Sequence, residues 1–319
     1  MIVADCVYGE EEINEPVLID LINSKEVQRL KGISQFGFPP EYSIRKGYSR
    51  YEHSIGVLIL LKRLKADLKE QIAGLIHDVS HTAFSHVADW VIGDPFKENY
   101  QDSIFEEFIK NSNIPPILEN YNLNLHNFLD LEKFYLLEQP APSLCADRFD
   151  YTIRQLPKIE DRKFIVPLVF NLNGRMVFTS EKAAEIFSNN YLMLQRDFWG
   201  SKDTIGRFHI LSNILKYALN KNIISMDSFK EDDSFIINCL LESKDLSIIS
   251  KLNLLKNGFR AVEDSNGVIM KKKFRYIDPE VLVDGELKRF SEISEDYKKN
   301  LEKEREENSR ELKIKIMEL

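Results

Sequence analysis

The sequence lacks the features of secreted, disulfide-rich and membrane-spanning proteins. Its three cysteines, Cys6, Cys145 and Cys239, are far apart and form no CxxC pair, which argues against a disulfide framework or a thiolate zinc site. The longest apolar run, Ile55 to Leu61, is far shorter than the ~20 residues that cross a bilayer. No basic region followed by a long apolar stretch opens the chain, so no signal peptide is expected. We therefore expect a cytoplasmic protein with no membrane partner.

Positive charge is also scarce. The chain has 43 Lys and Arg residues against 51 Asp and Glu residues, a formal net charge of -8. A nucleic-acid-binding protein normally has a basic face, so this balance disfavours a nucleic-acid partner, although a small anionic substrate remains compatible with it. The clearest basic cluster is Lys271-Lys272-Lys273 with Phe274 and Arg275, which we interpret as the charged edge of a strand.

The pattern of apolar residues predicts a mainly α fold with small β additions in the C-terminal half. Hydrophobic residues make up 43% of the 319 positions, enough for a sizeable core. Helical spacing is found over residues 14–37, 52–64, 68–79, 84–92, 103–110, 129–137, 143–156 and 181–218. Residues 111–116 are expected to form a loop.

Three stretches of the second half have other patterns. Asn173-Gly174 lies between two short apolar runs, 168–172 and 175–178, which predicts a hairpin with a type I′ turn. Residues 267–276 form a second β-like stretch. Residues 294–319 are rich in Lys, Glu and Arg and predict a solvated helix, with a partner-binding or oligomerising tail as the alternative.

Four of the six histidines lie close together in the sequence, at His53, His77, His81 and His86. Histidine is the commonest metal ligand in proteins and carries protons near neutral pH. His53 lies near the start of one predicted helix, and His77-Asp78 lie near the end of the next. One imidazole from each of two neighbouring helices, with an adjacent carboxylate, can hold one divalent ion.

A further ligand has to come from elsewhere in the chain. The best candidate is Asp147, because an unpartnered carboxylate on a helix that packs into the core would be costly. Imidazole and carboxylate together suit Mn, Fe, Co, Ni or Zn, and Mg also stays open. We therefore expect one divalent metal ion of unspecified identity.

Four linked motifs carry a resemblance to a known family. They are 27–37 (VQRLKGISQFG), 50–57 (RYEHSIGV), 77–86 (HDVSHTAFSH) and 147–151 (DRFDY). In this order they resemble the HD-domain metal-dependent phosphohydrolases, and most of all the branch of the deoxynucleoside triphosphate triphosphohydrolases, which includes the sterile-alpha-motif-and-HD-domain enzyme. The resemblance covers residues 14–156. It implies a helical HD-domain catalytic core over 1–160, with a mixed α/β region over 161–319 packed on it.

The resemblance also implies roles for individual residues. The metal ligands would be His53, His77, Asp78 and Asp147. The residues that line the reaction centre would be His81, His86 and Asp89, and those that hold phosphate or sugar would be Arg50, Arg148 and Tyr151. At position 99 the chain departs from the branch, because Asn99 stands where those enzymes have a histidine. Asn99 can hydrogen-bond a phosphate but can carry neither a proton nor a charge.

Three functions are compatible with these residues. The first is a metal-dependent nucleotide phosphohydrolase, with deoxynucleoside triphosphates as the leading substrates, in which water attacks phosphorus at the metal. The second is a nucleoside monophosphatase or a phosphodiesterase acting on a small or cyclic nucleotide. The third is a non-catalytic nucleotide sensor. A homo-oligomer is compatible with all three.

Overall fold

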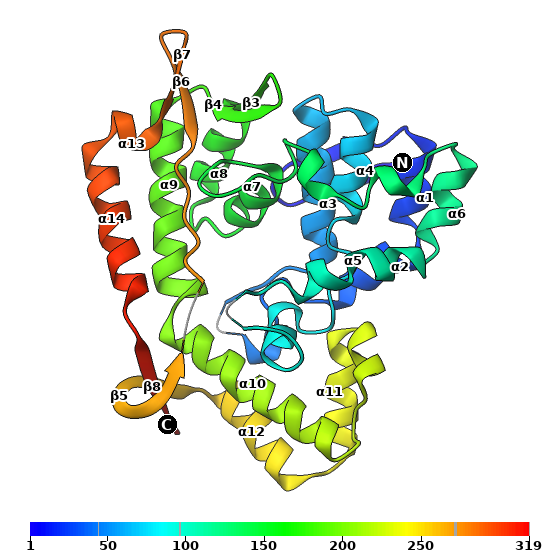
Figure 1. Ribbon diagram of the computed structural model, residues 1–319, viewed down its shortest axis with the longest axis vertical. Helices are drawn as coiled ribbons and strands as arrows, with labels where there is room; N and C mark the ends of the chain where they lie inside the picture. Colours follow the sequence, from blue (N-terminus) through cyan, green and yellow to red (C-terminus); the bar gives the residue numbers. More distant parts are fainter. Residues whose placement is uncertain (44, 96, 271–272, 319) are drawn as a thin grey trace.

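The computed structural model describes residues 1–43, 45–95, 97–270 and 273–318 (Figure 1). The fold is mainly α. The first half contains the helices α1 (Pro16–Ile22), α2 (Lys25–Arg29), α3 (Arg50–Arg63), α4 (Leu68–Ile76), α5 (Tyr100–Lys110), α6 (Ile114–Asn120) and α7 (Ala146–Ile153). The second half contains α8 (Ile159–Ile165), α9 (Glu181–Leu194), α10 (Lys202–Asn220), α11 (Asp233–Glu242), α12 (Leu246–Asn257), α13 (Phe290–Ile293) and α14 (Glu295–Ser309).

The strands form three small sheets. They are β1 (Ile2–Asp5), β2 (Gly9–Glu12), β3 (Val169–Leu172), β4 (Arg175–Phe178), β5 (Phe259–Met270), β6 (Glu280–Val283), β7 (Glu286–Arg289) and β8 (Leu312–Glu318). β1 pairs with β2, β5 pairs with β8, and the largest sheet has the order β3-β4-β6-β7. The predicted hairpin is confirmed as β3 and β4. Asn173 and Gly174 both have positive φ there, as a type I′ turn requires.

The paired helices α3 and α4 make the frame of the site. α3 begins at Arg50, just before the predicted start at residue 52, because Ser49 and Glu52 form a capping box, in which each side chain accepts a hydrogen bond from the other residue's backbone N–H. α4 was predicted to run to Val79, but it ends at Ile76. The carbonyl of Gly74 accepts a hydrogen bond from the His77 ring at 2.8 Å, and a turn follows.

Other helix boundaries also differ from the prediction. Residues 85–90 form a 3₁₀ helix rather than an α-helix, and of the predicted helix 129–137 only the 3₁₀ turn 131–133 is found. The expected loop 111–116 contains the start of α6, because Pro115 and Pro116 lie in its first turn, where proline costs no backbone hydrogen bond.

The C-terminal segments were only partly predicted. β5 ends at Met270, and Lys271 and Lys272 of the basic cluster lie outside the described residues. Lys273, Phe274 and Arg275 belong to no strand, so the expected charged strand edge is not found in the described part of the cluster. The charged tail is helical only as far as Ser309, and its end is the strand β8, which pairs with β5.

The main hydrophobic core contains side chains from both halves of the chain. Val57, Leu75 and Phe149 of the first half are fully buried in the same cluster as Phe178 and Phe187 of the second. Figure 1 shows α9 beside α14, and α10, α11 and α12 at the lower end of the view. A second core lies among α10, α11 and α12. Among the described residues, no helix combines the length and the apolar character needed to cross a membrane.

Candidate metal centre

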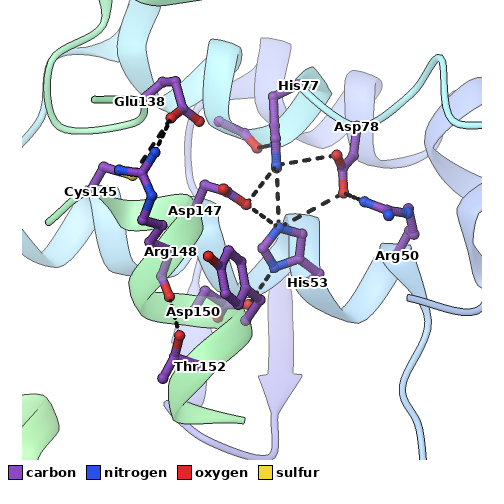
Figure 2. A network of polar contacts seen from close by, with 12 residues as sticks. Arg50, His53, His77, Asp78, Glu138, Cys145, Asp147, Arg148, Asp150 and Thr152 are labelled. Atoms are coloured by element: carbon purple, nitrogen blue, oxygen red, sulfur yellow. Dashed lines mark hydrogen bonds and ion pairs between the residues drawn. The ribbon is translucent and has the colours of Figure 1, made fainter. Parts of the chain in front are cut away.

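Two imidazoles and two carboxylates meet at the junction of α3, α4 and α7 (Figure 2). His53 Nε2 lies 3.0 Å from Asp147 Oδ1 and 3.3 Å from His77 Nε2. His77 Nε2 lies 3.7 Å from Asp147 Oδ1 and 3.5 Å from Asp78 Oδ1. The four side chains expected to hold a metal are therefore brought together, although Asp147 comes from a segment far away in the sequence.

Hydrogen bonds fix the orientation of both rings. His53 Nδ1 donates to Asp150 Oδ2 at 2.7 Å, and His77 Nδ1 donates to the carbonyl oxygen of Gly74. In a neutral ring, the Nε2 atom then has a free lone pair, and both Nε2 atoms point into the centre. Metal-binding histidines in proteins usually have this arrangement, with the second ring nitrogen bonded to a carboxylate or a backbone carbonyl.

The pKa shifts show that the centre attracts positive charge. Burial alone would lower the pKa of His53, but hydrogen bonds to Asp147 and Asp150 outweigh it and raise the pKa to about 9. Burial likewise opposes ionisation of Asp147, yet the two histidines hold its pKa below the ordinary value. The shifts of both pKa values thus show that the carboxylates around the histidines favour positive charge at this place.

These residues fit a divalent metal ion. One ligand atom each from His53, His77 and Asp147 lies within 4.8 Å of the other two, as a shared ion requires. Two imidazole nitrogens with carboxylate oxygens suit Mn, Fe, Co, Ni or Zn, and the site does not select among them. Asp78 is buried beside this group, and its Oδ2 atom is 3.8 Å from His53 Nε2.

Arg50 and His81 both contact Asp78. Arg50 Nη1 is 2.7 Å from Asp78 Oδ2, and Arg50 Nε donates to Ser85 Oγ at 2.9 Å. His81 Nε2 is 3.4 Å from Asp78 Oδ1. Burial, followed by the charge of Arg50, lowers the pKa of His81 well below its usual value, so this ring is neutral. Because α4 ends before His77, His77 and His81 are not on one helical face, yet both reach the centre.

His86 and Asp89 form a pair beside this group. His86 Nδ1 is 3.2 Å from Asp89 Oδ2, and the other oxygen of Asp89 accepts a hydrogen bond from the backbone N–H of Tyr100. The rings of His81 and His86 meet edge to face at 5.3 Å. The structure therefore brings together the three residues expected to line the reaction centre, and His81 among them contacts Asp78.

Of the residues expected to bind substrate, Arg148 and Tyr151 line the cavity and Asn99 does not. Arg148 lies in the cavity wall but pairs with Glu138 at 3.1 Å. The Tyr151 hydroxyl is 2.6 Å from the Tyr191 hydroxyl, and Tyr151 also faces the cavity. Asn99 is exposed at the N-terminus of α5 and is not among the described residues that line the cavity.

A cavity of about 680 Å³ opens over the centre. On the metal side it is lined by Arg50, His77, Asp78, His81, His86, Asp147 and Arg148. It is also lined by Tyr191, Phe198, Trp199, Lys273, Phe274, Arg275 and Tyr276. The aromatic side chains Phe198 and Trp199 are thus part of the cavity wall. His126 and His209 do not line it.

Several residues that support the site were not singled out in the sequence. Arg154 Nε bonds to Asp150 Oδ2 at 2.7 Å, and Arg154 Nη2 bonds to Asp5 Oδ2 at 2.6 Å, which links the first strand to the His53 ring. Glu138 lies beside Asp147, and burial together with the Asp147 charge raises its pKa to about 7. The Asp150-x₃-Arg154 spacing on one predicted helix was a signal for the first pairing.

A buried histidine–carboxylate centre beneath a cavity in a helical protein is the kind of site found in metal-dependent hydrolases. The family model of the HD domain matches residues 50–155, which contain all four ligand candidates. The protein YdhJ of Bacillus subtilis, described as uncharacterized, is 38% identical, and the alignment covers 99% of each chain. This chain belongs to the HD-domain metal-dependent phosphohydrolases and is a hydrolase of that superfamily.

Two further relatives are named for their activities. The metal-dependent phosphohydrolase cns2 of Cordyceps militaris is 33% identical over 67% of this chain and 65% of its own length. The deoxynucleoside triphosphate triphosphohydrolase SAMHD1 of Gallus gallus is 30% identical over 52% of this chain and 30% of its own length. The alignment thus covers only about a third of the vertebrate enzyme.

A solved structure supports the fold along the whole chain. The crystal structure of a phosphohydrolase from Bacteroides thetaiotaomicron superposes with a TM-score of 0.72, covering 100% of this chain and 99% of that one. Its sequence identity is 18%, so the likeness concerns the fold alone. It includes the C-terminal half, for which the sequence suggested no relative.

Proposed function

We propose that this protein hydrolyses phosphate esters of nucleotides at a single divalent metal ion held by His53, His77, Asp78 and Asp147. The convergence of these four side chains beneath the cavity carries the proposal. The nucleotide part rests on the relatives named as deoxynucleoside triphosphate triphosphohydrolases. The dispersed free cysteines support a location in the reducing cytoplasm.

The proposed mechanism assigns different tasks to the side chains around the metal. A divalent ion supplies positive charge next to the phosphate and lowers the pKa of water. The His86 ring, oriented by Asp89 through Nδ1, has its Nε2 atom available to accept a proton. Arg50 offsets the charge of the phosphate through the guanidinium nitrogen that contacts neither Asp78 nor Ser85.

The substitutions His77→Ala and Asp78→Ala test the metal centre. Each removes a ligand, so we expect both the bound metal and the phosphohydrolase activity to be lost. Elemental analysis of the purified protein should find close to one transition-metal ion per chain in the wild type. His126→Ala is the matched control, because His126 is exposed and does not line the cavity.

Two results would contradict the proposal. Full activity in a metal-free His77→Ala, Asp78→Ala double variant would exclude the metal mechanism. Nucleotide binding without turnover under every divalent metal tested would instead establish the sensor function.

A further inference from the structure

The charges around the cavity bear on how many phosphate groups the substrate carries. Seven carboxylate residues line the cavity among the described residues: Asp78, Glu98, Asp102, Asp130, Glu132, Glu138 and Asp147. Four cationic side chains line it with them: Arg50, Arg148, Lys273 and Arg275. The described lining therefore has three more acidic groups than basic ones, and a bound divalent ion would offset two of these.

All three arginines already have carboxylate partners. Arg50 lies 2.7 Å from Asp78, Arg148 lies 3.1 Å from Glu138, and Arg275 forms an ion pair with Glu98. Among the described lining cations, only Lys273 then has no carboxylate within ion-pair distance, and its ammonium group donates to the backbone carbonyl of Lys97. The arrangement differs from the unpaired cluster of basic groups that a highly charged anion needs.

The hydrogen-bonding capacity of two of these arginines is also partly used. Arg50 donates through Nε to Ser85 and through Nη1 to Asp78. Arg148 donates through Nη1 to the carbonyl of Ser143 and through Nη2 to Glu138. A guanidinium binds phosphate most strongly when two parallel N–H groups are free, so neither residue offers a complete fork.

The aromatic wall of the cavity suits a flat apolar group. The rings of Phe274 and Tyr276 stack with centroids 5.3 Å apart, and Trp199 meets Tyr151 edge to face at 5.4 Å. The volume of about 680 Å³ lies within the range of about 300–1,000 Å³ that is typical of small-molecule sites. A phosphate at the metal could thus extend into an aromatic group on this wall.

We propose, building on the proposed phosphohydrolase function, that the substrate is a phosphate monoester of nucleoside size and not a nucleoside triphosphate. A monoester carries about two negative charges, whereas a triphosphate carries roughly twice that number. The excess charge would face a lining in which Lys273 alone among the described cationic residues lacks a carboxylate ion pair. In the reaction, water adds its oxygen to phosphorus, the bond from phosphorus to the ester oxygen breaks, and the alcohol leaves with a proton.

Steady-state kinetics on deoxyadenosine mono-, di- and triphosphate, each with the same divalent metal, test this proposal. We expect kcat/KM to fall from mono- to triphosphate, by on the order of tenfold, because each added phosphate places more negative charge in an acidic cavity. The expected products are deoxyadenosine and orthophosphate. An equal or higher kcat/KM for the triphosphate, with release of tripolyphosphate, would overturn the proposal and leave the phosphohydrolase function standing.

Charge variants test the physical reason. Glu98→Gln keeps a hydrogen-bond acceptor for Arg275 but removes the paired charge, so it should raise kcat/KM for the triphosphate several-fold more than for the monophosphate. Glu132→Gln, at an exposed position of the cavity wall, should act in the same direction without affecting folding. Glu106→Gln is the matched control, because Glu106 pairs with Lys110 on the outside of α5.

The outcomes separate the two proposals. Hydrolysis of none of the three nucleotides under any divalent metal would contradict the proposed function itself. Unchanged mono-to-triphosphate ratios in both Glu98→Gln and Glu132→Gln would show that the carboxylates do not select against phosphate charge, and would overturn this inference alone.

Discussion

At the scale of single residues, the orientation of His53 matters most for the centre. Its Nδ1 atom bonds to Asp150, whose carboxylate also bonds to the buried Arg154. Asp5 on β1 holds the other end of the Arg154 guanidinium. The ring therefore keeps one tautomer and points Nε2 at the other proposed ligands. The residues that orient it, Asp150, Arg154 and Asp5, are not themselves proposed ligands.

Asp150→Asn should weaken metal binding without removing a ligand. The variant keeps the shape and one acceptor oxygen but loses the charge that orients His53, and such changes typically cost 10- to 100-fold in metal affinity, as an order of magnitude. Competition with a coloured chelator measures this affinity directly. Asp227→Asn, at an exposed position, should have no effect, and an unchanged affinity in Asp150→Asn would exclude this positioning role.

At the scale of elements, α3 and α7 approach closely at Gly56. A Cβ atom there would lie 1.9 Å from Arg154 Nη2 and 2.2 Å from Asp150 Oδ1. Both side chains are buried and held by ion pairs, so they cannot move aside at low cost. Glycine at this position allows the helix that carries His53 to pack against the helix that carries Asp147.

Gly56→Ala should therefore destabilise the protein, by about 1–3 kcal/mol from overpacking. Urea unfolding followed by circular dichroism measures the change in the free energy of unfolding. Gly47→Ala is the control, since a Cβ at Gly47 would meet its nearest neighbour, Phe36, at an ordinary 3.5 Å. Equal stability of the two variants would mean that the helices can separate without cost.

The sequence predicted those helices and strands well whose signals lie within one short segment of the chain. The helix α3 was predicted from the spacing of its apolar residues, and the hairpin of β3 and β4 from an Asn-Gly turn, because both signals lie within a short segment. The strand β8 was missed, although Leu312, Ile314 and Ile316 alternate with polar residues as a strand would. Its strand conformation depends on pairing with β5, which lies far away in the sequence.

At the scale of the whole molecule, the cavity closes between the two halves of the chain. Glu98 precedes α5 in the first half, and its partner Arg275 lies in the segment after β5. Burial alone would raise the pKa of Glu98, but Arg275, His86 and Lys273 together outweigh burial and lower it below the ordinary value of 4.5. The ion pair thus stabilises the folded state and joins the halves across the substrate space.

This ion pair predicts a pH dependence of stability. Because the folded-state pKa of Glu98 is lowered, its contribution is complete above pH 4.5 and is lost as the pH falls through the folded-state pKa. At pH 7, Glu98→Gln should lower the free energy of unfolding by about 1 kcal/mol, and the difference should shrink below pH 4.5. Urea titrations of both proteins at several pH values measure this. A difference that stays constant with pH would contradict it.

The sequence by itself predicted the chemistry of the proposed metal centre, because the types and order of the expected ligands are given by His53, His77-Asp78 and Asp147. Only the tertiary structure decided which neighbours those ligands have. Partners such as Arg148 with Glu138, or Arg275 with Glu98, meet through packing of separate segments, and Asn99 lies outside the cavity for the same reason. Electrostatic interactions depend on distance and burial, and neither can be read from spacing along the chain.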